Sequence, residues 1–288
     1  MSLSSTDAHA ATDSGFPGVF VDADWLAQHI DEPDLKVFQV GGDLYYHRFH
    51  IPGAPLFPYK EILGIREGVS GMRADRDHLA RVFGNMGIGP DTRVVAYDLG
   101  GGTDAARLIW TLASMGHHKG AILDGGLGGW LQADRPQEHH NPRLQPTEFQ
   151  ANPDTRWEVD WQELQALSEK QGETLVIDTR TQKEYVGMTL KPPRGHIPGA
   201  VHLDWTETLV APRTPLLRSR EELLARYAEL GAKDLEIPII VYCLTGHRAA
   251  QSWALLRHLG FKDVRLYDGS MMEWGMRNLP VVQGEKSR

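Results

Sequence analysis

The chain of 288 residues has a single cysteine, Cys243, and no long apolar run. One cysteine excludes an intramolecular disulfide, and without about 20 consecutive apolar residues we expect no membrane-spanning helix. The first residues show neither a basic nor an apolar segment of the secretory type, so we expect a cytoplasmic protein. The formal net charge of -8 argues against a nucleic-acid partner.

Several blocks of the sequence occur twice, in the same order. The pentapeptide HIPGA stands at residues 50–54 and again at 196–200, and residues 76–98 resemble residues 220–243. A chain about twice the size of a common domain fits such a duplication. The predicted organisation is a disordered tail over 1–17, a first domain over 18–137, a proline-containing linker over 138–156 and a second domain over 157–288.

Short apolar runs alternate with helical patterns within each copy, which predicts an α/β fold with a parallel sheet between helices. Ligands of such sheets bind beyond the carboxyl ends of the strands. In the second copy we expect strands over 175–177, 239–242 and 264–266, and helices over 220–230, 249–259 and 271–276. Cys243 therefore lies where a ligand would bind.

Cys243 also begins the six-residue loop CLTGHR, which leads from a strand into a helix. The start of a helix offers unpaired N–H groups and the positive end of the helix dipole, and both stabilise an anion. The thiolate of Cys243 is the anion that the loop itself can supply, so this residue is the candidate nucleophile.

The rest of the loop consists of Leu244, Thr245, Gly246, His247 and Arg248. Thr245 either bonds a moving sulfur or caps the helix, and Gly246 meets a backbone requirement. His247 either faces the substrate or is solvated. Arg248 either binds an anionic substrate or forms an ion pair at the helix start.

Three motifs resemble those of the rhodanese family. Tyr46-x3-HIPGA is similar to its N-terminal signature, and residues 264–274 are similar to its C-terminal signature, with Met271 where an aromatic residue is usual. A third pattern, Asp178-x-Arg180 followed by Glu184-Tyr185, precedes the second HIPGA. The resemblance covers about residues 19–282 and implies a tandem-domain sulfurtransferase with two rhodanese-like domains, each a five-stranded parallel sheet with helices on both faces.

The same resemblance implies that only the second domain is catalytic. Asp98 occupies the position of Cys243 in the first copy, and a carboxylate cannot accept and release sulfur. Cys243 would take sulfur from thiosulfate as a persulfide and pass it to cyanide or a thiol. 3-Mercaptopyruvate is the alternative donor. No metal or organic cofactor is expected, and the partners are a small-molecule donor and a thiophilic acceptor of a monomeric protein.

Two residues outside the loop are candidate substrate contacts. Arg194, two residues before the second HIPGA, maps to an arginine that binds substrate in mercaptopyruvate enzymes. Trp205 either lines the pocket or packs in the domain. Glu184 stands where larger tandem enzymes carry another substrate-binding arginine, and Leu244 and Thr245 stand where thiosulfate-type loops often carry cations.

Two other kinds of protein would also use a reactive cysteine. A phosphatase with a Cys-x5-Arg loop also uses a cysteine at a helix start, but its loop needs one more residue than separates Cys243 from Arg248. A persulfide carrier that hands sulfur to a partner protein is the alternative outside enzymes.

Overall fold

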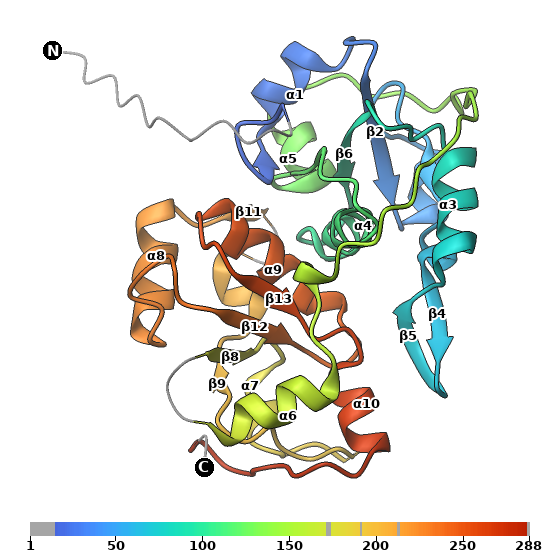
Figure 1. Ribbon diagram of the computed structural model, residues 1–288. Helices are drawn as coiled ribbons and strands as arrows, with labels where there is room; N and C mark the ends of the chain where they lie inside the picture. Colours follow the sequence, from blue (N-terminus) through green and yellow to red (C-terminus); the bar gives the residue numbers. More distant parts are fainter. Residues whose placement is uncertain (1–14, 171–173, 191, 212–213, 287–288) are drawn as a thin grey trace, which may run out of the picture.

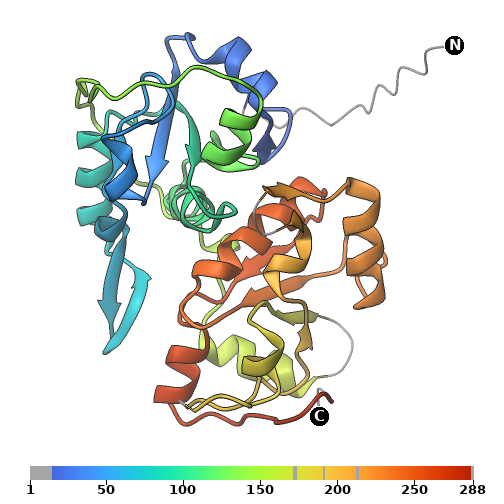
Figure 2. The ribbon, with the colours of Figure 1, turned by 180° about the vertical axis from the view of Figure 1, so that it is seen from behind.

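The computed structural model describes residues 15–170, 174–190, 192–211 and 214–286, which form two α/β domains joined by one linker (Figures 1 and 2). The sheet of the first domain has the order β1-β7-β6-β2-β3, and all its strands are parallel. Its strands are β1 (Phe20–Val21), β2 (Leu35–Val40), β3 (Leu56–Phe57), β6 (Arg93–Tyr97) and β7 (Gly120–Leu123). Its helices are α1 (Ala23–His29), α2 (Asp43–Tyr46), η1 (Tyr59–Ile62), α3 (Arg76–Asn85), α4 (Thr103–Ser114) and α5 (Gly126–Gln132).

Helices cover both faces of this sheet because successive residues of a strand point to opposite sides. In β6, Val94 and Ala96 pack with residues of α3 and α4 in one core. Val95 and Tyr97 pack with residues of α1 and α5 in another. A strand buried on both faces is a continuous apolar run, which is why these strands could be found in the sequence.

The second domain repeats this arrangement with the parallel order β13-β12-β8-β9. The position of β1 is taken by an isolated parallel bridge between Glu158 and Leu266, so the expected fifth strand is reduced to one pair. Its strands are β8 (Leu175–Asp178), β9 (Val201–His202), β12 (Ile239–Tyr242) and β13 (Val264–Leu266). Its helices are η2 (Thr155–Trp157), α6 (Trp161–Glu169), α7 (Gln182–Tyr185), η3 (Trp205–Thr208), α8 (Arg220–Glu229), α9 (His247–His258) and α10 (Ser270–Met276).

Each domain also extends one antiparallel hairpin to the other domain. The first hairpin, β4 (Leu63–Arg66) and β5 (Val69–Arg73), reaches α10 of the second domain (Figure 1). The second, β10 (Leu209–Ala211) and β11 (Thr214–Leu217), reaches α5 of the first. The backbone N–H at the end of each hairpin donates to an aspartate of the opposite domain, Arg73 to Asp268 at 2.7 Å and Leu217 to Asp124 at 2.9 Å. The repeated Asp-Gly motif thus joins the domains reciprocally.

Helices α4 and α9 pack against each other at the centre of the interface. Leu108 and Leu112 of α4 share one buried core with Trp253 and Leu256 of α9. An apolar core that runs through both domains fixes their relative position, because separating them would expose these side chains to water.

The linker lies along the first domain. The amide of Thr147 donates to Gly84 O and that of Asn152 to Met115 O, both at 2.9 Å. Phe149 is buried, with its ring centroid 4.9 Å from that of Phe83. These contacts bring the chain from the first domain to the edge of the second.

Most of the predicted tail, residues 1–14, lies outside the described residues. The boundary at residue 17 needs correction, because Phe16 is buried and its ring centroid lies 5.3 Å from that of Trp25. In the part of the chain that the structure describes, no helix has the length and apolar character needed to cross a bilayer.

We expect the free energy of unfolding to depend on pH through one buried histidine of the first domain. His117, between α4 and β7, is 7% exposed, and burial lowers its pKa from 6.5 to about 4. The unfolded chain gains this proton near pH 6.5 whereas the folded protein resists it, so the contribution is present above pH 6.5 and lost as the pH falls toward 4. We expect His117 to remove about 3 kcal/mol from the free energy of unfolding over that range.

Denaturant unfolding at several pH values measures this effect. His117→Gln cannot gain a proton and should flatten the dependence, whereas His47→Gln, at an exposed histidine, should keep it. An unchanged slope in H117Q would contradict the assignment.

Candidate active site

Cys243 directly follows β12 and is 1% exposed. The chain then turns at Gly246, whose φ of 74° lies in the left-handed region, and α9 begins at His247. The helix had been expected from Ala249, so the prediction was wrong by two residues. The sequence showed the strong helix formers but not the left-handed glycine that starts the helix earlier. His247 and Arg248 therefore belong to its first turn.

The side chain of Ser270 is hydrogen-bonded to two residues of the loop. Its Oγ accepts the backbone N–H groups of Cys243 at 3.1 Å and of Gly246 at 3.0 Å. Among the described residues, the N–H groups of Leu244 and Thr245 have no hydrogen-bond partner. Two donors beside the cysteine are therefore free to bind an anion at the sulfur.

The copy of this loop in the first domain already binds a carboxyl group of the chain. Asp98 follows β6 as Cys243 follows β12, and its buried carboxyl group accepts four backbone N–H groups of its loop and of the first turn of α4 at 2.9–3.2 Å. These donors are Gly100, Gly102, Asp104 and Ala105. Burial raises the pKa of Asp98, and these bonds work against that effect. Because α4 begins at Thr103, this loop has one residue more than that of Cys243. The strand-to-helix loop of this fold is thus an anion-binding structure.

Arg248 forms an ion pair rather than a free cationic site. Its Nη1 and Nη2 donate to the two carboxylate oxygens of Glu184 at 2.7 and 2.8 Å. Desolvation works against the charge of Glu184, yet the bonds from Arg248 and Thr181 prevail and lower its pKa to about 2. Of the two roles considered for Arg248, the structure shows the ion pair at the helix start.

The first domain covers the loop. His247 Nε2 lies 2.5 Å from Asp104 Oδ1, at the start of α4, and its ring centroid is 5.6 Å from that of Tyr59. Thr245 lies against β5, since a Cβ built on Gly71 would be 3.4 Å from the Cβ of Thr245. His247 and Thr245 are therefore interface residues as well as neighbours of the sulfur.

Gly246 is packed against a buried ion pair between the domains. Arg107 Nη2 of α4 lies 2.6 Å from Asp268 Oδ1, and both side chains are at most 5% exposed. A Cβ on Gly246 would lie 2.8 Å from Arg107 Nη1 and 2.9 Å from Asp268 O. The backbone requirement expected of Gly246 thus includes lack of space.

Trp205 lies at the other loop. A Cβ on Gly101, in the loop of Asp98, would lie 2.9 Å from an atom of the Trp205 ring. Tyr59, its counterpart nine residues after His50, lies instead beside the cysteine loop. Burial raises the pKa of Tyr59, and the charges of Asp104 and Cys243 add to this effect. Each domain therefore supplies the aromatic residue that covers the opposite loop, which a search within one copy could not reveal.

Arg194 has no contact with the loop among the described residues. Its guanidinium is exposed and donates to Leu190 O at 3.0 Å. Nor do the described residues contain a group of three histidine, cysteine or acidic side chains that could hold a metal ion.

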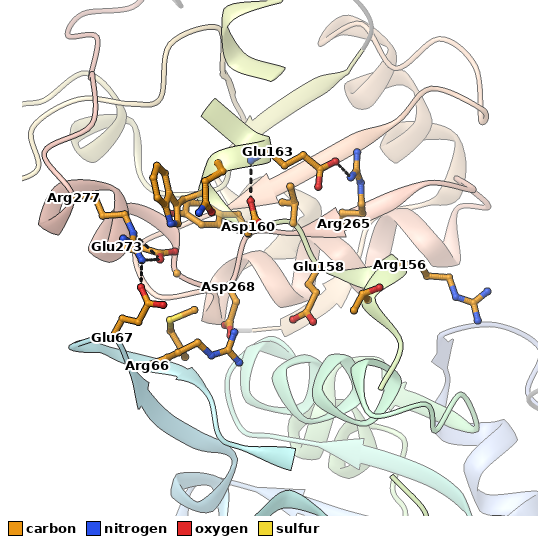
Figure 3. Close-up of a pocket in the computed structure, with 17 residues that line it drawn as sticks. Arg66, Glu67, Arg156, Glu158, Asp160, Glu163, Arg265, Asp268, Glu273 and Arg277 are labelled. Carbon is orange, nitrogen blue, oxygen red and sulfur yellow. Dashed lines mark hydrogen bonds and ion pairs between the residues drawn. The ribbon is translucent and has the colours of Figure 1, made fainter. Parts of the chain in front are cut away.

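A cavity of about 570 Å³ lies between hairpin β4–β5 and the second domain (Figure 3). Met72, Asp268 and Gly269 are among its lining residues, and Glu67 and Glu273 in it both pair with Arg277. Met72 lines this cavity, whereas a Cβ built on the adjacent Gly71 would lie 3.4 Å from the Cβ of Thr245 in the cysteine loop. Strand β5 therefore separates this cavity from the loop of Cys243.

Sequence reasoning missed five residues that surround the loop, three of which the first domain contributes. Two signals were present: Asp268 and Ser270 belong to the repeated Asp-Gly motif, and Tyr59 has the same spacing from HIPGA as Trp205. The five residues are Tyr59, Asp104, Arg107, Asp268 and Ser270.

Replacing Gly246 tests the packing of the loop. Gly246→Ala places a Cβ against Arg107 and Asp268 O at a positive φ, so we expect the free energy of unfolding to fall by about 1–3 kcal/mol. The displaced loop should also expose the buried thiol, so Cys243 should react faster with iodoacetamide. Gly128→Ala is the control, since nothing lies within 4 Å of a Cβ at that position. A variant G246A as stable as the wild type would contradict this account.

Known proteins resemble this chain over most of its length. A family model described as the rhodanese-like domain matches residues 22–133 and again 160–277. The sulfur carrier protein TtuD of Thermus thermophilus is 31% identical, over 94% of this chain and 98% of its own. The thiosulfate sulfurtransferase of Corynebacterium glutamicum is 32% identical, over 94% and 93% of the two chains.

Relatives from Escherichia coli show the same likeness in sequence and structure. Its 3-mercaptopyruvate sulfurtransferase is 33% identical, over 91% of this chain and 97% of its own. The crystal structure of SseA from Escherichia coli, described as having the rhodanese fold of 3-mercaptopyruvate sulfotransferases, superposes with a TM-score of 0.78. It is 30% identical in sequence and covers 88% of this chain and 98% of its own.

Proposed function

This chain belongs to the rhodanese family, and on that premise we propose that it is a sulfurtransferase whose Cys243 carries the transferred sulfur as a persulfide. The relatives named for thiosulfate and for 3-mercaptopyruvate both move sulfur, and the present chain resembles them over nearly its whole length. Cys243 is the sole cysteine and stands at the carboxyl end of a central strand.

The carboxylate of Asp98 is the observation that supports a persulfide most directly. An aspartate places its oxygens two bonds beyond Cβ, and a cysteine persulfide places its terminal sulfur at the same remove. In the first domain the loop binds that anionic end with four N–H groups. A persulfide on Cys243 would end in the same part of its loop, where the N–H groups of Leu244 and Thr245 are free.

The reaction follows from these positions. The thiolate of Cys243 attacks the outer sulfur of thiosulfate, the sulfur–sulfur bond breaks, and its electron pair leaves with sulfite. The loop N–H groups and the start of α9 stabilise the resulting persulfide anion. An acceptor such as cyanide or a thiolate then attacks the terminal sulfur, and the electron pair of that bond restores the thiolate of Cys243.

The first domain acts in this proposal as a cover. Asp98 fills its loop and has no sulfur to exchange, while Tyr59, Asp104 and Gly71 lie over the loop of the second domain. Because one chain supplies both the loop and its cover, the proposal requires no second subunit.

Two sulfur donors are compatible with this function. We propose thiosulfate, with 3-mercaptopyruvate as the alternative, in keeping with relatives of both kinds. A carrier role is the second candidate, since one relative is named a sulfur carrier protein. A phosphatase is not proposed, because the guanidinium that would hold phosphate is bound to Glu184.

Mass spectrometry of the intact protein tests the persulfide. Thiosulfate should add the mass of one sulfur, cyanide should remove it as thiocyanate, and Cys243→Ser should do neither. With one cysteine in the chain, the site of the added sulfur is unambiguous. If neither thiosulfate nor 3-mercaptopyruvate modifies the wild-type protein, the proposed function fails. Comparing their rates identifies the donor.

A further inference from the structure

The guanidinium of Arg248 is bound to a carboxylate of its own chain. Both terminal nitrogens donate to Glu184, in the parallel two-bond geometry by which a guanidinium binds carboxylates and other oxyanions. The two side chains are 22% and 21% exposed, so salt screens the pair less than it would at the surface. An anionic donor that reaches the loop meets a cation whose binding edge is occupied.

Glu184 is held at this place independently of Arg248. It is the third residue of α7 and forms a capping box with Thr181, whose Oγ1 and N donate to Glu184 Oε2 at 2.8 and 3.1 Å. A carboxylate fixed by the start of its own helix is a permanent negative charge beside the cysteine loop.

The other basic side chains around the loop also contact carboxylates. His247 contacts Asp104, and Arg107 contacts Asp268. Among the described residues, each basic side chain of this group thus faces a carboxylate, which offsets the positive charge that it could present to a dianionic donor. The free loop N–H groups can still stabilise a single anionic sulfur.

From these contacts we infer that Glu184 is a specificity-determining residue, which disfavours sulfur donors with two negative charges relative to donors with one. The inference rests on the proposed sulfurtransferase function. Thiosulfate carries two charges, whereas a thiosulfonate, R–SO₂–S⁻, carries one and delivers the same outer sulfur. With either donor the thiolate forms a bond to that sulfur, the sulfur–sulfur bond breaks, and its electron pair leaves with sulfite or with a sulfinate.

The test measures the second-order rate constant for formation of the Cys243 persulfide with thiosulfate and with benzenethiosulfonate. Glu184→Gln removes the charge and keeps the shape, so we expect the constant for thiosulfate to rise by about fivefold or more. Because Coulomb energy is proportional to the product of the charges, the factor for benzenethiosulfonate should be about the square root of that for thiosulfate.

Glu222→Gln is the matched control. Glu222 forms the same capping box with Ser219 at the start of α8 and lies near an arginine, Arg218, at 3.7 Å. It has no described contact with the loop of Cys243. This variant should leave the ratio of the two rate constants at its wild-type value, so a loss of capping alone would not imitate the effect.

A second variant tests the same inference in case E184Q does not fold. Arg248→Met leaves the charge of Glu184 unbalanced, so the constant for thiosulfate should fall by a larger factor than that for benzenethiosulfonate. A ratio that stays unchanged in the folded variants, or that moves the opposite way, overturns the role of Glu184. Failure of the proposed function is distinct from both results, because the wild-type protein would then gain sulfur from neither donor.

Discussion

The site depends on one constraint: a loop that turns from a parallel strand into a helix leaves backbone N–H groups that need an anion. The first domain meets this need with the carboxylate of Asp98, which accepts four of them. In the second domain a shorter loop leaves donors free around the sulfur of Cys243. The same loop thus occurs twice: in the first domain its N–H groups bind Asp98, and in the second domain two N–H groups remain available to an anion at the sulfur of Cys243.

The interface between the domains completes the open copy. Each hairpin ends on the aspartate of the opposite Asp-Gly motif, and each domain covers the other's loop with an aromatic residue, Tyr59 or Trp205. The symmetry breaks at the cysteine. Arg107 reaches Asp268 there, while Gln251 of α9, at the corresponding position, bonds Thr208 instead. Of these two corresponding positions, only the one beside the loop of Cys243 carries a buried guanidinium.

Charge around the sulfur is closely balanced. Arg248, His247 and Arg107 each contact a carboxylate, so the field at Cys243 comes chiefly from backbone N–H groups and the start of α9. Such a field suits one negative charge on sulfur.

The sequence by itself determined the duplication, the α/β class and the position of Cys243 at a strand end, because HIPGA repeats, apolar runs and strand-end loops are local patterns. It also pointed to Asp98 as the residue that replaces the cysteine. The sequence did not predict the start of α9 or the reduced fifth strand of the second domain. The conformation of Gly246 and the pairing of Glu158 depend on packing against residues far away in the chain. Only the tertiary structure decided that Glu184 binds Arg248 and that Tyr59, rather than Trp205, covers the reactive loop, since both contacts join residues far apart in the chain.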